Sequence, residues 1–553
     1  MRKQHKCSPR NSDIIHVLDV FFQEHPNYFG LRSKLVSTKT RSSSGVVVIT
    51  VVTSPYPEFN GKKQSFSCKW NCYYCPNEPG QPRSYLHDEP AVIRANVNNF
   101  DPVLQFVDRA NALRQKGHII DKIELIVLGG TWESYPNEYR VNFIRDLFFA
   151  ANTFMSLQRS KKTLEEEQII NETAASKIIG LTLETRPDTI TIDCIRNLRR
   201  LGCTRVQLGV QHTDDTILKK INRQCTTEDT VRALRLLKDA CYKVDIHLMP
   251  NLPGSSVEKD LAMFKDVLTN PDLQADQWKI YPCEIVPWTV IEKMFKNGSY
   301  IPYGNDELIE LIIKVKSHVP KHIRLNRVVR DIPSQYIFND NIPNLRNDLE
   351  KIMQKRGLQC LCIRCREPGH KRCDIDLQKF ELQFYKYQSS GGVDFFLSFE
   401  YNNVCAAFLR LRLTRTHVFE SMKNMAFVRE LHVYGEVTRV SDRKHHIQHA
   451  GLGTRLLKQA EYIAFLNGYT QIAVISGVGT REYYRKKGYK TMDENFYLIK
   501  NLYSYYVMCA LFVFSFVFAT LFLYKLQIDL IFCHSFEDKD NLNQIQDVIE
   551  HVS

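Results

Sequence analysis

Three cysteines near the N-terminal end of the chain, Cys68, Cys72 and Cys75, lie on one short segment and could hold a metal cluster. A 4Fe–4S cluster has four irons, so three thiolates leave the fourth iron free to chelate a small ligand. Zinc would need a fourth protein ligand close by, and the nearest candidate, His87, lies well outside the segment. The segment therefore favours an iron–sulfur cluster over a zinc site.

The spacing Cys-x3-Cys-x2-Cys, with the aromatic Tyr74 directly before the last cysteine, is typical of radical S-adenosylmethionine (SAM) enzymes. In these enzymes the free iron chelates the amino and carboxylate groups of SAM. We expect Tyr74 to pack beside the adenine, and the alternative is an aromatic side chain in the core.

The elements that must position this segment follow from the pattern of apolar residues between about residues 46 and 330. Short β-branched runs predict strands at 46–52, 123–128, 178–183, 206–210, 244–248 and 278–281, and helical patterns between them include 102–116, 138–151, 193–201 and 228–240. Alternating βα units form a parallel sheet, so we expect an α/β fold with a partial TIM-type barrel over residues 46–345. Segment 156–177 has no apolar period and predicts a polar insertion or an exposed helix.

Several predicted strands end in residues that suit a SAM site, at the edge of a parallel barrel where ligands gather. These residues are Gly129 and Gly130, Glu184 and Arg186, and Gln211. The glycines let the backbone approach a ligand closely, the carboxylate suits ribose hydroxyls, and the guanidinium suits a carboxylate or a phosphate. Each residue could instead merely end its strand, so the prediction depends on their joint position after the cysteine segment.

A second group of cysteines, Cys360, Cys362 and Cys365, lies in a junction that we place at residues 346–378. Three thiols at this spacing suit one tetrahedral zinc ion, which would hold together a segment that lacks a long apolar run. His370, Cys373 or a distant residue could supply the fourth ligand. A second iron–sulfur cluster and the absence of a metal are the alternatives.

From about residue 380 the pattern changes to strands at 395–401, 406–413, 429–434 and 472–476, with one helix at 453–466. The turn into the helix, from Gln448 through Gly451 to Gly453, fits the Gln/Arg-x-x-Gly-x-Gly/Ala loop of acetyltransferases with the GNAT fold. There the N–H groups at a helix N-terminus bind the pyrophosphate of coenzyme A, although an ordinary helix entry has a similar sequence. We expect an α+β acetyltransferase domain over residues 379–500.

Two further features support acetyl-CoA binding in this domain. The strand containing Glu430, Leu431, His432 and Val433 could pair with the acetyl-pantetheine arm. Downstream, Tyr483 or Tyr484 could donate a proton or position the thioester.

The composition predicts a multidomain protein in a reducing compartment. The chain has 553 residues and 16 cysteines but no N-terminal apolar h-region, and thiols in such a protein bind metal rather than pair. Its net charge of +13 gathers in a basic arm at residues 1–45 and again at 351–373. Both stretches could contact nucleic-acid phosphates, and an ordinary solvated surface is the alternative.

Residues 503–524 are 22 consecutive uncharged, mostly apolar positions, followed by a short polar tail at 525–553. A helix of that length spans a bilayer, and a buried core helix is the alternative. Lysines before the stretch and a net acidic tail after it predict cytosolic catalytic domains. We therefore expect a transmembrane tail anchor in an organelle membrane, either the mitochondrial outer membrane or the endoplasmic reticulum.

These features together make the chain similar to the catalytic subunit of Elongator, the tRNA uridine(34) acetyltransferase family, which combines radical SAM and GNAT domains. The resemblance covers about residues 35–498. It depends on the strings at 121–124, 184–188, 202–205, 328–333, 429–435 and 473–481.

The resemblance implies one composite reaction at the wobble uridine of tRNA, with other Elongator subunits as partners. A SAM-derived 5′-deoxyadenosyl radical would take hydrogen from the methyl group of acetyl-CoA, the carbon radical would add to carbon 5 of the uridine, and hydrolysis would leave 5-carboxymethyluridine. The family's acetyl-CoA contacts fall on Lys122, on Glu430 to Val433, on Leu452, Gly453 and Thr454, and on Tyr484. Because Lys122 belongs to the barrel, the resemblance predicts that both domains share one ligand.

Two other functions fit parts of the sequence. One is a protein lysine acetyltransferase, in which the second domain works alone with Glu430 or His432 as the base. The other is a tethered binding module without chemistry, which the intact cysteines and the Gly451-x-Gly453 loop argue against. Loss of Cys72 separates the functions, because only tRNA modification needs the cluster.

Overall fold

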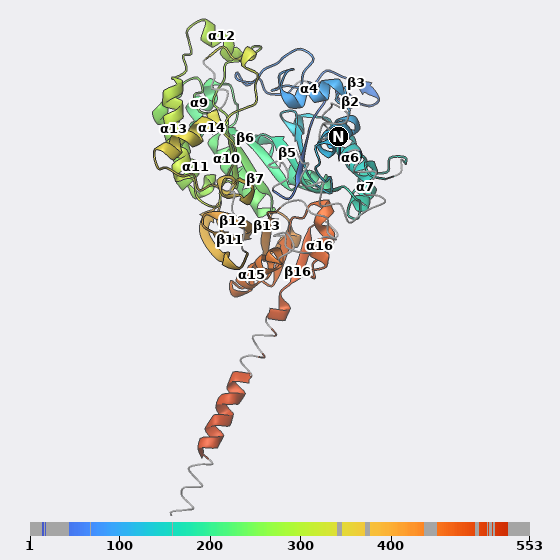
Figure 1. Ribbon diagram of the computed structural model, residues 1–553, viewed down its shortest axis with the longest axis vertical. Coiled ribbons are helices and arrows are strands. Elements are labelled where there is room, and N and C mark those ends of the chain that lie inside the picture. Colours follow the sequence, from blue (N-terminus) through green and yellow to red (C-terminus); the bar gives the residue numbers. More distant parts are fainter. Residues whose placement is uncertain are drawn as a thin grey trace, which may run out of the picture.

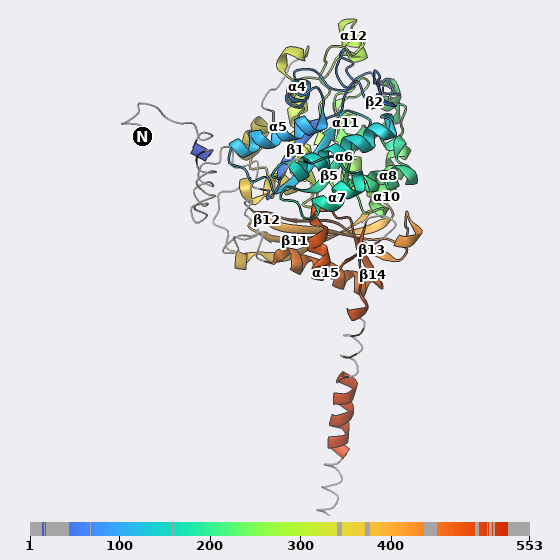
Figure 2. The same cartoon turned by 90° about the vertical axis from the view of Figure 1, so that its right-hand side faces the viewer.

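The computed structural model describes residues 14–15, 17, 44–66, 68–156, 159–339, 345–370, 377–435, 451–492, 497–505, 507, 511 and 515–528. Figures 1 and 2 show a barrel domain, a sheet domain packed against one end of it, and a helical segment that extends away from both. Gln448 and most of the predicted basic arm lie outside the described residues.

The barrel domain is built on seven parallel strands in the order β1-β4-β5-β6-β7-β8-β9. They are β1 (Val47–Val52), β4 (Lys122–Leu128), β5 (Lys177–Thr185), β6 (Arg205–Gln211), β7 (Lys243–Leu248), β8 (Gln277–Ile280) and β9 (Arg324–Arg327), and a separate hairpin pairs β2 (Glu58–Phe59) with β3 (Lys62–Lys63). The six predicted strands are confirmed, and so is the partial barrel. The sequence analysis missed β9, because only Leu325 of its four residues is buried.

Helices cover the outside of the barrel (Figure 1). They are α4 (Pro90–Val97), α5 (Pro102–Gln115), α6 (Asn137–Thr153), α7 (Leu164–Asn171), α8 (Ile192–Arg200), α9 (Asp215–Lys220), α10 (Thr227–Asp239), α11 (Val257–Thr269), α12 (Val290–Lys296), α13 (Asn305–His318) and α14 (Leu345–Lys355). Side-chain caps begin several of them: the Thr191 side chain accepts a hydrogen bond from Cys194 N at the start of α8, as Ser256 does from Lys259 N at α11. The apolar faces of the helices and the outward faces of the strands form one continuous core.

Helix α7 corrects the prediction of a polar insertion or an exposed helix at 156–177. It begins with a capping box between Thr163 and Glu166, and it buries Leu164, Glu167 and Asn171. Glu167 is buried because Arg159 donates to it at 2.6 Å and Asn152 Nδ2 donates to it at 2.8 Å. A helix buried through polar side chains that satisfy one another leaves no apolar period in the sequence.

The sheet domain has the strand order β10-β11-β12-β13-β14-β16-β15. Its elements are β10 (Glu381–Ser389), β11 (Gly392–Tyr401), β12 (Val404–Leu413), β13 (Met425–Val433), α15 (Leu452–Leu466), β14 (Gln471–Val474), α16 (Arg481–Arg485), β15 (Lys490–Thr491) and β16 (Leu498–Asn501). The pair β13 and β14 is parallel and is bridged by α15, but the pairing stops at Val428, so the rest of β13 lies free of β14. The four predicted strands and the predicted helix are confirmed.

Buried charges join the two domains. Arg429 of β13 donates to both carboxylate oxygens of Asp276, at 2.6 and 2.7 Å, and also to Asp394 at 2.9 Å. Arg412 of β12 donates to Asp239, at the end of α10, at 2.6 Å. The side chains of Arg412, Arg429, Asp276 and Asp394 are fully buried. If the two domains moved apart, these charges would lose their partners, and an unpaired buried charge costs free energy. We therefore expect the domains to be held in one arrangement.

The loop after β14 packs directly on the barrel backbone. A Cβ atom added to Gly477 would lie 1.9 Å from the carbonyl oxygen of Ile179 in β5, and one added to Gly479 would lie 2.6 Å from Cβ of Lys177. Nearby, Arg199 of α8 donates to the carbonyl oxygen of Ser476 at 2.8 Å. Glycine at 477 is therefore what allows this close approach.

The predicted transmembrane helix at 503–524 is corrected by the structure. Within the described part of the chain, the helices are too short or too polar to cross a bilayer. The predictions of a tail anchor, of the membrane as a partner and of an organelle-membrane location are therefore wrong.

Candidate active site

A cavity of about 380 Å³ occupies the interior of the barrel. Inward-pointing side chains form its wall, at every second position along most strands, as expected for a pleated sheet. They include Val48 and Thr50 of β1, Glu124, Ile126 and Leu128 of β4, Arg205, Gln207 and Gln211 of β6, Lys243 and His247 of β7, Gln277 and Lys279 of β8, and Arg324 and Asn326 of β9. The cavity reaches Tyr74 of the cysteine segment and also Glu430, His432 and Tyr434 of the sheet domain.

The length of the cavity can be judged along β7. Both Lys243 and Met249 line it, and the six residue steps from one to the other span about 20 Å of extended chain. Reacting atoms must approach to about 3–3.5 Å. Ligands held at the two ends therefore cannot react unless one of them reaches through the barrel.

The cysteine segment lies at the carboxyl ends of the strands. Cys72 is buried, and Cys68 and Cys75 are half-buried. Sγ of Cys68 lies 3.6 Å from the hydroxyl of Thr131, directly after the glycines that end β4. Tyr73 N donates to the carbonyl oxygen of Ile221 at 3.0 Å and so ties the segment to the barrel. The cysteine segment therefore lies beside the residues that follow the strands, as a site shared between them requires.

Two buried guanidinium groups point at Cys72. Arg186 Nη1 lies 3.4 Å and Arg223 Nη1 lies 3.5 Å from its sulfur. Burial raises the pKa of Cys72, but the charges of Arg223 and Arg186 outweigh burial and the pKa is lowered. The thiolate is the form that binds iron, so these surroundings fit an iron–sulfur cluster. Arg186 also binds Asp188 at 2.9 Å and so faces the cysteine rather than an open ligand position.

The residues predicted for SAM divide into two groups. Glu184, Gln211 and Tyr74 line the cavity. Tyr85 Oη donates to Glu184 at 2.8 Å, and burial raises the pKa of this carboxyl. Gln211 has a left-handed φ of 72°, and its Oε1 is buried without a hydrogen-bond partner among the described residues. A buried acceptor of this kind fits a ligand that brings a hydroxyl or amino donor.

Gly129 and Gly130 form the second group, and protein packing explains one of them. Gly129 has a φ of 143°, and a Cβ atom there would lie 1.6 Å from Oγ1 of Thr53. Gly130 has a φ of 85°, and a Cβ atom there would lie 3.2 Å from the carbonyl oxygen of Arg83. Gly129 is therefore required by the barrel itself, whatever ligand binds beside it.

His247 and Lys279 are among the cavity residues that the sequence analysis missed. Lys279 Nζ donates to Gln207 Oε1 at 2.7 Å, and burial lowers its pKa to about 8 although the carboxylates of Asp245 and Glu184 oppose the shift. Burial also holds the pKa of His247 well below its ordinary value, and its Nε2 has no partner among the described residues. The sequence does contain a signal for these residues: polar side chains recur at every second position of a strand that is otherwise apolar, where a buried strand is expected to be apolar throughout.

The sheet domain closes the opposite end of the cavity through β13. Glu430 and His432 face the cavity, whereas Leu431 and Val433 point the other way, toward Gly453 of α15. Arg410 donates to Glu430 at 2.9 Å, and Lys243 of the barrel lies 3.5 Å from it. Burial opposes ionisation, but Lys243 and Arg410 lower the pKa of Glu430 to about 2. Glu430 is therefore a paired carboxylate, and its lowered pKa makes it a poor general base.

The predicted coenzyme A loop leads into α15. Gly451 has a left-handed φ of 77° at the helix N-cap. A Cβ atom on Gly453 would lie 2.9 Å from the hydroxyl of Tyr483, and Thr454 is hydrogen-bonded to the same tyrosine. Tyr483 is 38% exposed, whereas Tyr484 is buried, so Tyr483 is the tyrosine that stands at the loop.

Two predicted ligand residues stand apart from this cluster. Leu452, in the first turn of α15, is buried in the core of the sheet domain. Lys122 is the first residue of β4 and is the register partner of Lys177, against which Gly479 packs. Lys122 therefore lies at the domain junction, as the prediction of a shared ligand requires. Along β4, however, the first residue that lines the cavity is Glu124.

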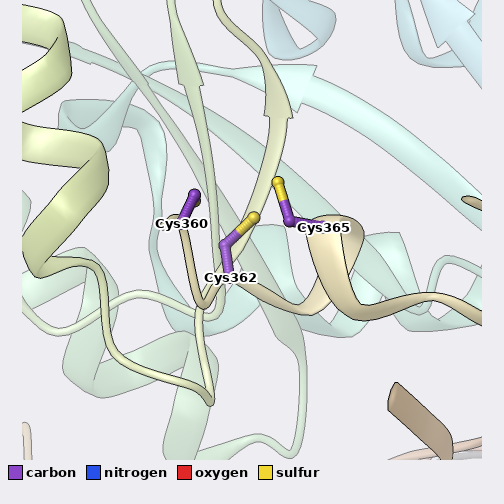
Figure 3. Close-up of side chains that lie close together, drawn as sticks. All are labelled: Cys360, Cys362 and Cys365. Carbon is purple, nitrogen blue, oxygen red and sulfur yellow. The ribbon is translucent and has the colours of Figure 1, made fainter. Parts of the chain in front are cut away.

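The second cysteine group is brought together by the loop after α14, where Figure 3 shows the three side chains. The sulfur atoms of Cys360, Cys362 and Cys365 lie within 4.8 Å of one another, the one such group of three potential ligands in the part of the chain that the structure describes. Three converging thiols fit a structural zinc ion. Cys373 and the side chain of His370, the predicted fourth ligands, lie outside the described residues.

Two protein-family models match the barrel. The Radical SAM superfamily matches residues 65–266, and the Radical SAM C-terminal domain matches residues 275–355. The first match contains the cysteine segment and the second extends from the start of β8 through α14.

Comparison with known proteins extends the likeness over both domains. The chain is 43% identical to a tRNA uridine(34) acetyltransferase of Methanocaldococcus infernus over 466 residues, covering 81% of this chain and 85% of the relative. It is 35% identical to human Elongator complex protein 3 over 511 residues, covering 90% of each. The solved structure of the archaeal Methanocaldococcus infernus Elp3 superposes with a TM-score of 0.71 at 40% identity, covering 83% of this chain and 99% of that one.

Proposed function

We propose that this chain, which belongs to the family of tRNA uridine(34) acetyltransferases and Elongator complex protein 3, modifies the wobble uridine of tRNA. In finer terms, it forms 5-carboxymethyluridine from acetyl-CoA by a radical SAM reaction, with tRNA and other Elongator subunits as partners. The single observation that carries the finer proposal is the cavity, because side chains of both domains line one continuous space.

A 4Fe–4S cluster with SAM would supply a 5′-deoxyadenosyl radical at the end of the cavity that Tyr74 lines. Cys68, Cys72 and Cys75 would hold the cluster, and the guanidiniums of Arg186 and Arg223 would stabilise its thiolates. Lys279 remains protonated below a pKa of about 8 and would bind an anionic or carbonyl oxygen in the cavity.

At the other end, the free part of β13 offers unpaired backbone to an extended acyl chain. Gly451 and Gly453 would let the pyrophosphate of coenzyme A approach the N-terminus of α15, and Tyr483 would stand over it. The acetyl group would then enter the barrel past Glu430 and His432. The buried ion pairs between the domains favour this internal route over a closing movement of one domain on the other.

The experiment uses the full-length protein, reconstituted without oxygen, with SAM, a reductant, acetyl-CoA labelled in the methyl group and unmodified tRNA. Digested nucleosides are read by mass spectrometry. We expect labelled carboxymethyluridine that disappears in Cys72→Ala and persists in Cys194→Ala, a half-buried barrel cysteine outside the cavity wall. Label on protein lysines alone, unchanged in Cys72→Ala, would show that the protein is a lysine acetyltransferase instead.

A further inference from the structure

The rim of the cavity beside the cysteine segment carries exposed aromatic side chains. Trp288 is 43% exposed and Phe338 is 46% exposed. Trp70 is half-buried within the cysteine segment, where the guanidinium of Arg186 lies 4.2 Å from its ring. Tyr336 completes the set, with its ring centroid 6.2 Å from that of Trp288. We call Trp70, Trp288, Tyr336 and Phe338 the aromatic rim.

Trp288 is tied to the cysteine segment by backbone hydrogen bonds. Its carbonyl oxygen accepts from Asn77 N at 3.1 Å, and Val290 N donates to the carbonyl oxygen of Tyr73 at 3.0 Å. Val286, two residues earlier, lines the cavity. Figures 1 and 2 place α12, which begins at Val290, at the end of the barrel away from the sheet domain. The backbone of Trp288 therefore lies at the outer end of the barrel, two residues from the cavity wall and beside the cysteine segment.

The backbone of Trp288 has a φ of 59°, in the left-handed region that favours glycine. For a bulky aromatic residue this conformation is an outlier that costs free energy. The surroundings maintain it: Trp288 N donates to Glu292 Oε2 at 3.1 Å, and Thr289 Oγ1 accepts from Glu292 N at 3.0 Å. A residue with a strained backbone and a partly exposed ring contributes little to folding stability. Strained backbone conformations of this kind are found mainly at functional sites.

The neighbouring rings are also held in place from behind. Tyr336 Oη donates to Asp88 Oδ2 at 3.0 Å, and Gln335 donates to the same oxygen at 2.7 Å. Lys296 Nζ lies 5.0 Å from the ring of Phe338, and Lys69 lies 5.5 Å from the ring of Trp70. Exposed aromatic faces interleaved with lysines suit single-stranded nucleic acid, whose bases stack on rings and whose phosphates attract cations.

We propose that Trp288 is a stacking platform for a nucleobase next to the uridine that enters the cavity. The uridine can reach a buried cavity only after it leaves the base stack, and a ring at the rim replaces the stacking that its neighbour loses. This inference rests on the proposed function, because it needs RNA as the substrate. It adds a positioning residue that holds the nucleotide beside the target.

The test measures binding of a synthetic anticodon stem-loop RNA to the full-length protein, by fluorescence anisotropy at fixed salt. Loss of one stacked base costs about 1–3 kcal/mol, so we expect Trp288→Ala to weaken binding about tenfold. Trp288→Phe keeps a ring and should retain most of the affinity. Ile301→Ala removes a side chain that is 80% exposed and should leave binding unchanged.

A second arm uses RNA that lacks the base on one or the other side of the uridine. If Trp288 stacks on the missing base, Trp288→Ala has almost no further effect on that RNA, whereas a merely structural role predicts the same tenfold loss on both RNAs.

The outcomes separate this inference from the proposed function. If the wild type binds and modifies tRNA but Trp288→Ala binds the stem-loop normally, the stacking inference is overturned and the function stands. If binding weakens by an equal factor with intact and abasic RNA, or if Trp288→Ala instead dissociates a dimer of this chain, the inference is also overturned. If the wild type neither binds nor modifies tRNA, both fail.

Discussion

The buried carboxylate of Asp276 is the most direct test of how the two domains are held together. It lies just before β8 in the barrel and receives both arms of Arg429 from the sheet domain, at 2.6 and 2.7 Å. Val244 N donates to it at 2.9 Å, and Arg410 lies 3.6 Å away. Asp276→Asn keeps the shape of the side chain but removes the charge, so two buried guanidiniums lose their shared counter-ion.

Removal of one partner from a buried ion pair costs about 3–5 kcal/mol. Asparagine can still accept one hydrogen bond, and Arg429 keeps Asp394 at 2.9 Å, so we expect the lower end, a loss of about 3 kcal/mol in the free energy of unfolding. Asp272→Asn is the matched control: this carboxylate is exposed and four residues away, and its loss should cost less than about 0.5 kcal/mol.

The pH dependence of this stabilisation follows from the same contacts. Burial opposes ionisation of Asp276, but Arg429 and Arg410 outweigh it and hold its pKa far below the ordinary value. A lowered carboxyl pKa stabilises the folded state above the pKa of the unfolded chain, about 3.9, and that contribution is lost as the pH falls below it. The difference between wild type and Asp276→Asn should therefore be largest near neutral pH and shrink below about pH 4.

The assay combines urea unfolding with product analysis. At urea concentrations where Asp276→Asn is still folded by circular dichroism, we expect SAM cleavage to continue while carboxymethyluridine falls, because the loosened sheet domain no longer meets the cavity. A loss of stability below about 1 kcal/mol would refute the claim that the domains depend on these charges. Full product formation by a variant whose domains separate in limited proteolysis would refute the internal route.

Three further predictions concern single residues. Burial lowers the pKa of Lys279 to about 8, against about 10.4 in an unfolded chain. Between these pH values the unfolded state binds more protons, so the free energy of unfolding rises with pH. Burial also lowers the pKa of Lys238 to about 8, so Lys279→Met should reduce that rise in urea titrations without abolishing it. Glu461 is 2% exposed and accepts from Lys500 at 2.8 Å, so Glu461→Gln should cost about 2 kcal/mol of stability, measured the same way. Cys362→Ser should remove bound zinc, counted by mass spectrometry of metals, and lower the melting temperature without preventing SAM cleavage.

The fold could be predicted from the sequence where burial leaves a simple pattern. Strand β5 is almost wholly buried and reads as a mostly apolar run between helical periods. Strand β7 is also buried, but its apolar residues Val244, Ile246 and Leu248 alternate with polar ones. The cysteine segment and the Gly451-x-Gly453 loop could be recognised as candidate sites, because each is a motif of a few consecutive residues; their ligands stay predictions. Local motifs of this kind need no knowledge of distant contacts.

The parts that could not be predicted depend on partners far apart in the chain. Arg412 and Asp239 are 173 positions apart, and each alone looks like an ordinary surface charge in the sequence. Glu167 reads as solvated until Arg159 and Asn152 are seen to satisfy it. The predicted membrane helix shows the opposite error: it rested on a count of apolar residues, and among the described residues no helix is long and apolar enough to cross a membrane.

The interior of the barrel is lined largely by polar and charged side chains. Barrels of this type usually fill their interior with layers of branched apolar side chains. Here Asp245 Oδ1, His247 Nε2 and Gln211 Oε1 are buried without hydrogen-bond partners among the described residues. An unsatisfied buried polar group costs about 1–3 kcal/mol, so a barrel that served only as a scaffold gains nothing from them. A ligand that supplies hydrogen-bond partners to these atoms stabilises the folded state. The unpaired atoms that lower the stability of the protein without its ligand therefore also determine which ligand binds.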